Sequence, residues 1–242
     1  MADLYGMTGK IARVDLTSGT VSVVEPGEEI YRKFLGGSAL GAYYLMKEGI
    51  LDPGVDPLGP DNLWQLMIGP VTGAGANPRS VITCKSPYNN FCATTCGGHA
   101  GAELKFAGWD GIQVTGKASS PVYISIVDDN IEIRDASHLW GMEVEEAEII
   151  MKKEVMADIE FREAMIRDAD LTPEWAEMRP PKRLGMHEKR LAHVWLIGVG
   201  GENQVWYAAT MTEGARAHGR HGSGAVAGSK NLKGIVVRGT KE

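Results

Sequence analysis

The chain has 242 residues, of which 43% are hydrophobic and 23% charged, and its formal net charge is -6. These proportions are ordinary for a globular protein. The acidic balance argues against general nucleic-acid binding, so an anion site must come from a local group of basic residues. No apolar run approaches the roughly 18 residues of a membrane helix. Three cysteines do not indicate a disulfide framework. The first residues lack the apolar core of a signal peptide, and we expect a cytoplasmic protein.

The first quarter of the chain predicts a β-hairpin followed by two helices. Apolar and polar residues alternate through 9–16 and 21–25, on either side of a glycine-containing turn, which is typical of paired strands. Residues 28–51 then indicate a short helix, a Gly-Gly break and a second helix from about Ser38, its expected N-cap. A loop rich in proline and glycine follows at 52–62.

Short strands dominate the middle of the chain. They are predicted at 63–69, 79–84, 111–117, 121–128 and 130–135, with a short helix at 99–108. The clearest helix is 142–155, because its first turn is acidic and its lysines come late, as the helix dipole prefers. The segment at about 157–190 is charged and has a Pro-Pro break, and we expect an inserted arm there rather than core.

Strand-like sequence returns at 191–211, and a basic glycine-rich loop, a short helix at 224–232 and a strand at 234–239 close the chain. About ten short strands with a few helices predict an α+β fold, a β-rich base with mostly antiparallel sheets. Residues 1–242 show no internal repeat at a fixed period and are expected to form one domain. Three tryptophans fall in strand patterns, which favours core packing for each: Trp64, Trp195 and Trp206.

The loop from Glu213 to Gly224 gathers positive charge on a flexible backbone. Its glycines have neither G-x-G-x-x-G nor P-loop spacing, which argues against a nucleotide motif. Arg216 and Arg220 still supply guanidinium groups suited to phosphate or carboxylate. A helix beginning near Ser223 would point its positive end at the same place. The alternative is a surface turn that binds nothing.

Two further glycine-rich segments support the anion hypothesis. Arg79 follows the glycine-rich turn at 69–78, and a Gly-Gly pair lies at 36–37. Each segment lies beside the predicted end of a strand or helix, so the three could converge on one hollow. Together they predict a large cofactor that is polar or carries several phosphates.

The cysteines leave two interpretations open. Cys92 and Cys96 form a C-x-x-x-C pair with Cys84 and His99 nearby, which could indicate a metal or iron–sulfur site. The usual spacing is C-x-x-C, and a fourth ligand is not evident. The favoured alternative is thiols in a partly buried, glycine-rich segment.

The remaining histidines do not identify a catalytic group. His218 and His221 could transfer protons or contact an anion, whereas His138 is expected to pack against a loop. No Ser-His-Asp or paired-carboxylate arrangement stands out, so no catalytic residue is predicted.

Eight sequence blocks follow one another in a recognisable order: GKIARVDLTSGTV, FLGGSALGAYYL, GPVTGAGA, CKSP, GGHAGAELKFAGWDGIQVTGKA, PVYISI, GENQVWYAA and EGARAHGRHGSGAVAGSKNLKGIVVRGTKE. This series resembles the N-terminal domain of the tungsten-containing aldehyde ferredoxin oxidoreductase family. The resemblance covers almost the whole chain apart from the charged arm, and ELKFAGWD and GRHGSGAVAGSK are its most specific parts. EIRDASHLWG also resembles the branch of the family that reduces aromatic acyl-CoA thioesters.

The resemblance implies a β-rich base on which a tungsten bis-pterin cofactor lies. Arg216 and Arg220 would bind the pterin phosphates, and the carbonyl of Ala217 would bind a magnesium ion that bridges them. Thr95 stands where the family usually has the asparagine that offers the other carbonyl, and a main-chain ligand tolerates that change. Arg79 matches the arginine between pterin and the iron–sulfur cluster. The glycines matched to the cofactor loops are Gly97, Gly98, Gly219, Gly222 and Gly224.

Family members continue well beyond this domain, and their [4Fe-4S] cysteines lie in that later part. We therefore expect the cofactor-binding base subunit of a split tungsten or molybdenum oxidoreductase. Its substrate would be an aldehyde or acid, or an acyl-CoA, and a ferredoxin-like carrier would exchange electrons with it. A separate chain would supply the remaining domains and the cluster. The alternative is a non-catalytic, stand-alone pterin-binding or assembly module that has lost redox activity, with a homo-oligomer as one form of it.

Overall fold

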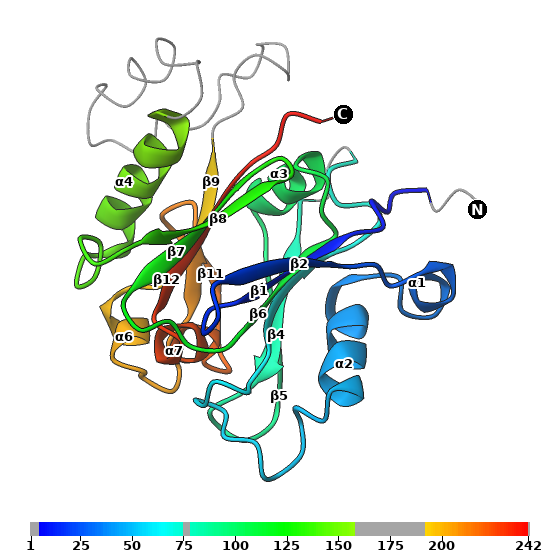
Figure 1. Cartoon of the computed structure of the whole chain (residues 1–242), viewed down its shortest axis with the longest axis horizontal. Helices are drawn as coiled ribbons and strands as arrows, with labels where there is room; N and C mark the ends of the chain where they lie inside the picture. The colour runs from blue at the N-terminus through cyan, green and yellow to red at the C-terminus, as the bar shows by residue number, and fades with distance from the viewer. Residues whose placement is uncertain (1–4, 75–77, 158–191, 242) are drawn as a thin grey trace.

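Two six-stranded sheets packed face to face form the centre of the protein (Figure 1). The computed structural model describes residues 5–74, 78–157 and 192–241. The first sheet has the order β2-β1-β6-β3-β4-β5, with β1 at Ile11–Asp15, β2 at Thr20–Val24, β3 at Trp64–Ile68, β4 at Ser80–Lys85, β5 at Phe91–Cys96 and β6 at Gly111–Thr115. The second has the order β11-β10-β9-β12-β7-β8, with β7 at Val122–Val127, β8 at Asn130–Asp135, β9 at His193–Leu196, β10 at Thr210–Thr212, β11 at Arg216–His218 and β12 at Leu232–Arg238.

Antiparallel pairing dominates both sheets. Among the described residues β1 pairs with β6 and β7 with β12 in parallel, and the other strand pairs are antiparallel. The predicted α+β fold is therefore confirmed. The strands β5 and β11 are not predicted from the sequence, because they are short and lack a run of alternating apolar residues. The strand β10 begins at the end of the strand-like segment predicted at 191–211.

Helices cover the outer faces of the two sheets. The pair α1 (Glu28–Phe34) and α2 (Gly37–Lys47) packs on the first sheet, and α4 (Val144–Ala157) packs on the second. The helices α3 (Ala100–Phe106) and α7 (Ser223–Ser229) contribute to the central core from opposite ends of the sandwich (Figure 1). Residues 199–202, predicted as part of a strand-like segment, instead form the single turn α6 (Val199–Glu202). The other predicted helices are confirmed.

The start of α2 differs from the prediction. The helix begins at Gly37 with Gly36 at its N-cap, not with Ser38, and no side chain caps it. A Cβ at Gly36 would lie 2.6 Å from the carbonyl oxygen of Ile68, so the chain needs glycine there to approach the first sheet. The Gly-Gly pair therefore serves helix packing.

Successive side chains of a strand point to opposite faces, so one strand contributes to two cores. In β1, Ala12 joins the core between the sheets, whereas Ile11 lies in the core beneath α1 and α2. In β12, Val237 faces the central core and Val236 lies beneath α4. This alternation gives four layers, in the order helix, sheet, sheet, helix.

A buried polar junction lies at 103–110, the segment with the sequence ELKFAGWD. Glu103 pairs with Arg238 at 2.8 Å, which joins α3 to the end of β12. Lys105 pairs with Asp110 at 2.6 Å, and the hydroxyl of Tyr31 donates to the same carboxylate at 2.8 Å. This block therefore holds the N-terminal segment, α3 and β12 together.

Two sequence predictions are not tested by the described residues. The charged arm predicted at about 157–190 lies outside them apart from its first residue, and the single-domain boundary of 1–242 stays a prediction. In the part of the chain that the structure describes, no helix combines the length and apolar character needed to cross a bilayer.

Candidate functional site

The edge strands of the two sheets, β5 and β11, lie side by side and form the surface that carries most of the predicted site residues. His218, at the end of β11, is fully buried and joins them. Its Nδ1 lies 2.9 Å from the carbonyl oxygen of Thr94 in β5, and its Nε2 lies 3.2 Å from Ser80 Oγ in β4. The second sheet is thereby fixed against the first.

The protonation state of His218 follows from these partners. A carbonyl can only accept, so Nδ1 carries the hydrogen and Nε2 of the neutral ring accepts from Ser80. Burial lowers the pKa of His218 to about 4, although its bond to Thr94 acts in the opposite direction. The indole N–H of Trp195 donates to the same Ser80 oxygen at 3.3 Å. His218 is therefore a structural bridge at neutral pH, not a proton donor.

The backbone of Thr95 faces the open edge of the first sheet. The N–H of Ser86 donates to the carbonyl of Asn90 at 2.8 Å and closes the β4–β5 hairpin. Bonded and non-bonded pairs alternate along an antiparallel ladder, which makes Thr94 and Ile82 a bonded pair. The N–H and C=O of Thr95 then point away from β4. Its carbonyl is on the side available to a ligand.

Ala217 lies on the neighbouring edge. It is the central residue of β11 and is exposed. Because His218 is bonded to Thr94, the residues that precede and follow them, Ala217 and Thr95, belong to the same surface. The two residues predicted to offer carbonyl groups are thus exposed neighbours of the bonded pair His218 and Thr94, on the adjacent edge strands of different sheets.

Two arginines from different sheets lie near the end of β5, because Arg79 precedes Ser80, the partner of Cys96, and Arg216 lies beside Gly97. Arg79 precedes β4 and Arg216 begins β11, and both are exposed. Burial has the largest effect on Cys96 and raises its pKa, whereas the charges of Arg216 and Arg79 act to lower it. Arg216 Nη1 lies 3.5 Å from the point that a Cβ on Gly97 would occupy. Arg79, Arg216 and Gly97 therefore converge at one end of β5.

The partly buried carboxylate of Glu213 contacts the guanidinium group of Arg216. Glu213 Oε2 lies 3.2 Å from Arg216 Nε, and Glu213 Oε1 accepts from the backbone N–H of His99. His193 Nδ1 lies 3.4 Å from Oε1. Burial raises the pKa of Glu213, but its close contact with His193 and its contacts with His99 outweigh burial and lower that pKa to about 2. Glu213 is therefore ionised at neutral pH.

The glycine next to this carboxylate has a packing role. Gly98 has φ +111°, and a Cβ there would lie 2.9 Å from the carboxylate of Glu213. The predicted reason for this glycine, close approach to a cofactor, is not needed to explain it. Glu213 was not predicted as a site residue, although it opens the EGARAHGRHG block that contains Arg216.

The loop after β11 adopts an unusual backbone conformation. Arg220 and His221 both have left-handed φ values, 55° and 61°, and Gly222 follows with 75°. Such conformations are uncommon for residues other than glycine and concentrate at functional sites. Arg220 and His221 are exposed, and Ser86 Oγ donates to the His221 carbonyl at 2.8 Å. This loop continues the β11 edge toward the tip of the β4–β5 hairpin.

The helix α7 begins at Ser223, where a helix start was predicted, and its first turn is buried. The helix has seven residues, all buried, and the N–H of Gly224 donates to the carbonyl of Ala208 at 2.9 Å. The N–H of Gly224 is therefore already hydrogen-bonded within the protein and cannot donate to a ligand. A Cβ at Gly222 would lie 2.1 Å from the Trp206 carbonyl, and one at Gly224 2.5 Å from that of Ala209. Close packing accounts for both glycines. At Gly219, by contrast, a Cβ would meet nothing within 4 Å.

The thiol interpretation of the cysteines is supported. Cys84 and Cys92 are partners across β4 and β5, both fully buried, and Cys96 is 4% exposed. All three are free, and the described residues contain no group of three or more metal-ligating side chains. A hydrogen bond with Cys92, together with burial, raises the pKa of Cys84.

The tryptophan and histidine predictions have mixed outcomes. Trp64 and Trp195 are core residues, as predicted, but Trp206 is 54% exposed and stacks edge-on against Tyr88. Its strand-like neighbours belong instead to the loop before β10. His138 packs beside Glu154 at 2.7 Å, as expected for a residue that fixes a loop.

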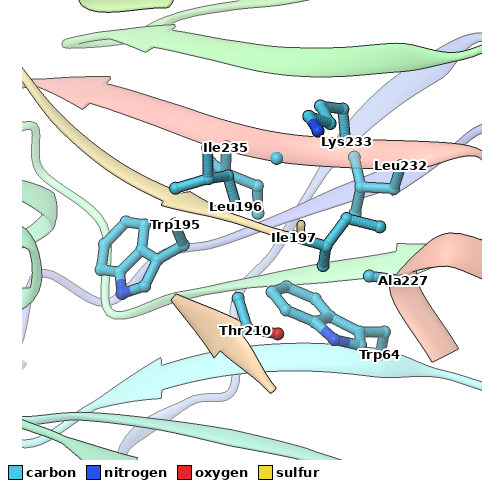
Figure 2. A pocket seen from close by; sticks show the side chains of 10 residues that line it. Trp64, Trp195, Leu196, Ile197, Thr210, Ala227, Leu232, Lys233 and Ile235 are labelled. Carbon is cyan, nitrogen blue, oxygen red and sulfur yellow. The ribbon is translucent and has the colours of Figure 1, made fainter. Parts of the chain in front are cut away.

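A small pocket inside the sandwich is not a ligand site (Figure 2). It lies near Trp64 and Trp195 and has a cavity volume of about 10 Å³, far below the roughly 300–1,000 Å³ of ligand pockets. The lining is mainly apolar, and Lys233 extends away from the two indole rings toward Glu202 (Figure 2). The space is a packing gap.

Comparison with known proteins agrees with this fold. The family described as "Aldehyde ferredoxin oxidoreductase, N-terminal domain" matches residues 11–169 and 154–239. The chain belongs to the aldehyde ferredoxin oxidoreductase family. The tungsten-containing aldehyde ferredoxin oxidoreductase of Thermococcus kodakarensis is 44% identical over 241 residues, which are 98% of this chain and 34% of that protein. The "Aliphatic sulfonate oxidoreductase, WOR-like subunit" of Pyrococcus furiosus is 40% identical over 239 residues, 98% of this chain and 35% of that protein.

A solved structure shares the architecture. It is the active site complex BamBC of benzoyl coenzyme A reductase with 1,5-dienoyl-CoA, at a TM-score of 0.80 and 34% identity. The match covers 98% of this chain and 32% of that one. The chain therefore spans about a third of the length of the relatives it matches. The EIRDASHLWG segment lies at β8, the edge of the second sheet opposite β11, and so is remote from the candidate site in strand order.

Proposed function

We propose that this chain is the cofactor-binding base of a split tungsten or molybdenum bis-pterin oxidoreductase. The observation that supports it most directly is the convergence of Arg79, Arg216 and the outward backbone of Thr95 on the surface formed by β5 and β11. Two cations beside open carbonyl groups match the needs of a metal-bridged diphosphate. Guanidinium binds phosphate oxygens, and main-chain oxygen binds magnesium.

The residues have separate roles in this proposal. Arg79 and Arg216 bind and orient the phosphate groups, and Arg220 extends the cationic surface along the same edge. The carbonyls of Thr95 and Ala217 hold the magnesium ion. Gly97, Gly98, Gly219, Gly222 and Gly224 shape the loops around them. When bound, the cofactor supplies two-electron chemistry, and the protein positions and tunes it.

The partner in this proposal is a chain that carries the remaining family domains. The present chain covers 34% of the Thermococcus relative, and its described cysteines are buried inside the sandwich. The partner would supply the [4Fe-4S] cluster and complete the site. Electrons would pass to or from a ferredoxin-like carrier, with an aldehyde and acid pair or an acyl-CoA as substrate.

Metal and pterin analysis tests the proposal. The chain is purified alone and with a co-expressed partner, and tungsten, molybdenum, iron and pterin are measured in each preparation. We expect pterin and tungsten or molybdenum on the complex, with iron arriving only with the partner. Pterin without redox activity in the complex would favour a non-catalytic binding or assembly module. Protein free of metal and pterin in both preparations would contradict the proposal.

A paired substitution tests the site itself. Arg216→Ala combined with Arg220→Ala should lower pterin occupancy of the complex about tenfold or more, as expected when charge-assisted phosphate contacts are removed. The matched control is Arg13→Ala, which removes a guanidinium paired with Glu48 in the first sheet and should leave occupancy unchanged. Circular dichroism checks that both proteins fold.

A further inference from the structure

Glu213 lies in the turn of the β10–β11 hairpin. It follows β10 and has φ +50°, the left-handed region in which glycine or asparagine is at ease. The next residue, Gly214, also has positive φ. Its N–H donates to Glu148 of α4 at 2.7 Å, so the outer helix holds the turn.

The Glu213 carboxylate uses both of its oxygens. Oε1 faces the backbone N–H of His99 and the ring of His193, and Oε2 faces Arg216 Nε at 3.2 Å. The side chain is 18% exposed, whereas that of Arg216 is 56% exposed. Gly98 leaves the space in which the carboxylate sits. One anion is thus anchored on three elements, the N-terminal end of α3, β9 and the β10–β11 turn.

The contact between Glu213 and Arg216 uses one edge of the guanidinium group. Nε lies at ion-pair distance from the Glu213 carboxylate, and Nη1 lies 3.5 Å from the point that a Cβ on Gly97 would occupy. A planar guanidinium held by Nε keeps its Nη donors in a fixed direction.

We propose that Glu213 is a positioning residue, which fixes the guanidinium of Arg216 so that its Nη donors face a phosphate bound on the β5–β11 surface. This inference rests on the proposed function and adds to it the group that orders the cation. Glu213 is not a ligand, since its negative charge repels phosphate. Glu213 orders the long side chain of Arg216 before the ligand binds, so less conformational entropy is lost on binding.

Charge and geometry predict opposite effects of substitution, which makes the proposal testable. Removing a negative charge beside the site should strengthen anion binding if only charge matters. If positioning matters more, binding should weaken. Glu213→Asp keeps the charge and shortens the reach, and Glu213→Gln keeps the length but sets an amide donor against one of the two N–H groups.

The first measurement is calorimetric titration of the full chain with inorganic pyrophosphate at low salt. Wild type should bind, and Arg216→Ala should bind about tenfold more weakly. Both Glu213 variants should bind about fivefold more weakly than wild type. The matched control Glu48→Gln, which loosens Arg13 on the first sheet, should bind as wild type does. Thermal unfolding confirms that each variant is folded.

The second measurement needs no ligand. Nitrogen-15 relaxation of the Arg216 Nε–H group should report an ordered side chain in wild type and a mobile one in both Glu213 variants. If the variants bind pyrophosphate as tightly as wild type, or if Arg216 stays ordered in them, the positioning role is wrong. If wild type itself fails to bind pyrophosphate, the proposed function is contradicted, and the relaxation data alone then decide the role of Glu213.

Discussion

His218 and Thr94 are joined by a hydrogen bond of 2.9 Å between the imidazole Nδ1 and a main-chain carbonyl, and this bond links the edge strands of two different sheets. Ser80, bonded to the other ring nitrogen, adds β4 to the same junction. Each of these residues is next in sequence to a proposed cofactor residue, Arg79, Thr95 or Ala217. The buried junction and the exposed site are therefore two faces of the same strands.

The first prediction concerns pH. Burial lowers the pKa of His218 from 6.5 to about 4, so the unfolded chain binds more protons between these values and stability rises with pH across them. The contribution is fully present above pH 6.5 and is lost as pH falls toward 4. It corresponds to about 3 kcal/mol in the free energy of unfolding. Urea unfolding between pH 7 and pH 4.5 measures it.

The control for that experiment is His218→Asn, which cannot titrate. Its stability should be lower than that of wild type at pH 7, because the ring packing and the Ser80 contact are lost. Its stability should also change less between pH 7 and pH 4.5. An unchanged pH dependence would show that His218 is not the group responsible.

The second prediction concerns a glycine of α7. Alanine normally stabilises a helix relative to glycine by about 1 kcal/mol. A Cβ at Gly228, however, would lie 1.9 Å from the carbonyl oxygen of Gly201. Gly228→Ala should therefore destabilise the protein, by about 1–3 kcal/mol as overpacking does. Gly200→Ala is the matched control, since a Cβ there meets nothing within 4 Å. Thermal unfolding should show a lower Tm for Gly228→Ala and an unchanged Tm for Gly200→Ala.

Sequence patterns predict the parts of the fold whose signal is local. The hairpin of β1 and β2 has alternating residues around a glycine turn, and α4 has a charge gradient along its length. Both are confirmed because the local preference and the final packing agree. The strand β5 has no such pattern, since FCATTC places two cysteines and two threonines where apolar residues are expected.

The site could be predicted only in part. The basic residues and glycines of the loops are visible as composition, and the family resemblance gives each a role. The contact between β5 and β11 depends on a side chain that crosses from one sheet to the other, which no periodicity reports. The role of several glycines also cannot be read from the sequence, because it depends on residues that are distant in the chain. Gly98, Gly222 and Gly224 make room for Glu213 and for carbonyl groups distant in sequence.

The third prediction concerns Asp110. Its carboxylate accepts from Lys105 at 2.6 Å, from Tyr31 at 2.8 Å and from the N–H of Gly9 at 2.9 Å, and it is 1% exposed. Asp110→Asn leaves Lys105 without its counter-ion, which should cost about 3–5 kcal/mol in the free energy of unfolding. Asp129→Asn is the matched control, an exposed carboxylate paired with lysines, and should stay close to wild type. Equal losses in the two variants would contradict the buried network.

The last prediction concerns the three thiols. Cys84 and Cys92 are fully buried, and burial raises the pKa of Cys96, so little thiolate is available at neutral pH. A thiol reagent such as Ellman's reagent should label the native chain slowly and all three cysteines rapidly in guanidinium chloride. Labelling then reports opening of the sandwich, and destabilised variants such as Gly228→Ala should react faster in proportion to their loss of stability. Cys96→Ser tests whether the least buried thiol dominates the slow reaction. Rapid labelling of Cys96 in the native chain at neutral pH would show that this end of β5 opens freely. The backbone that carries Arg79 and Arg216 would then not be rigid.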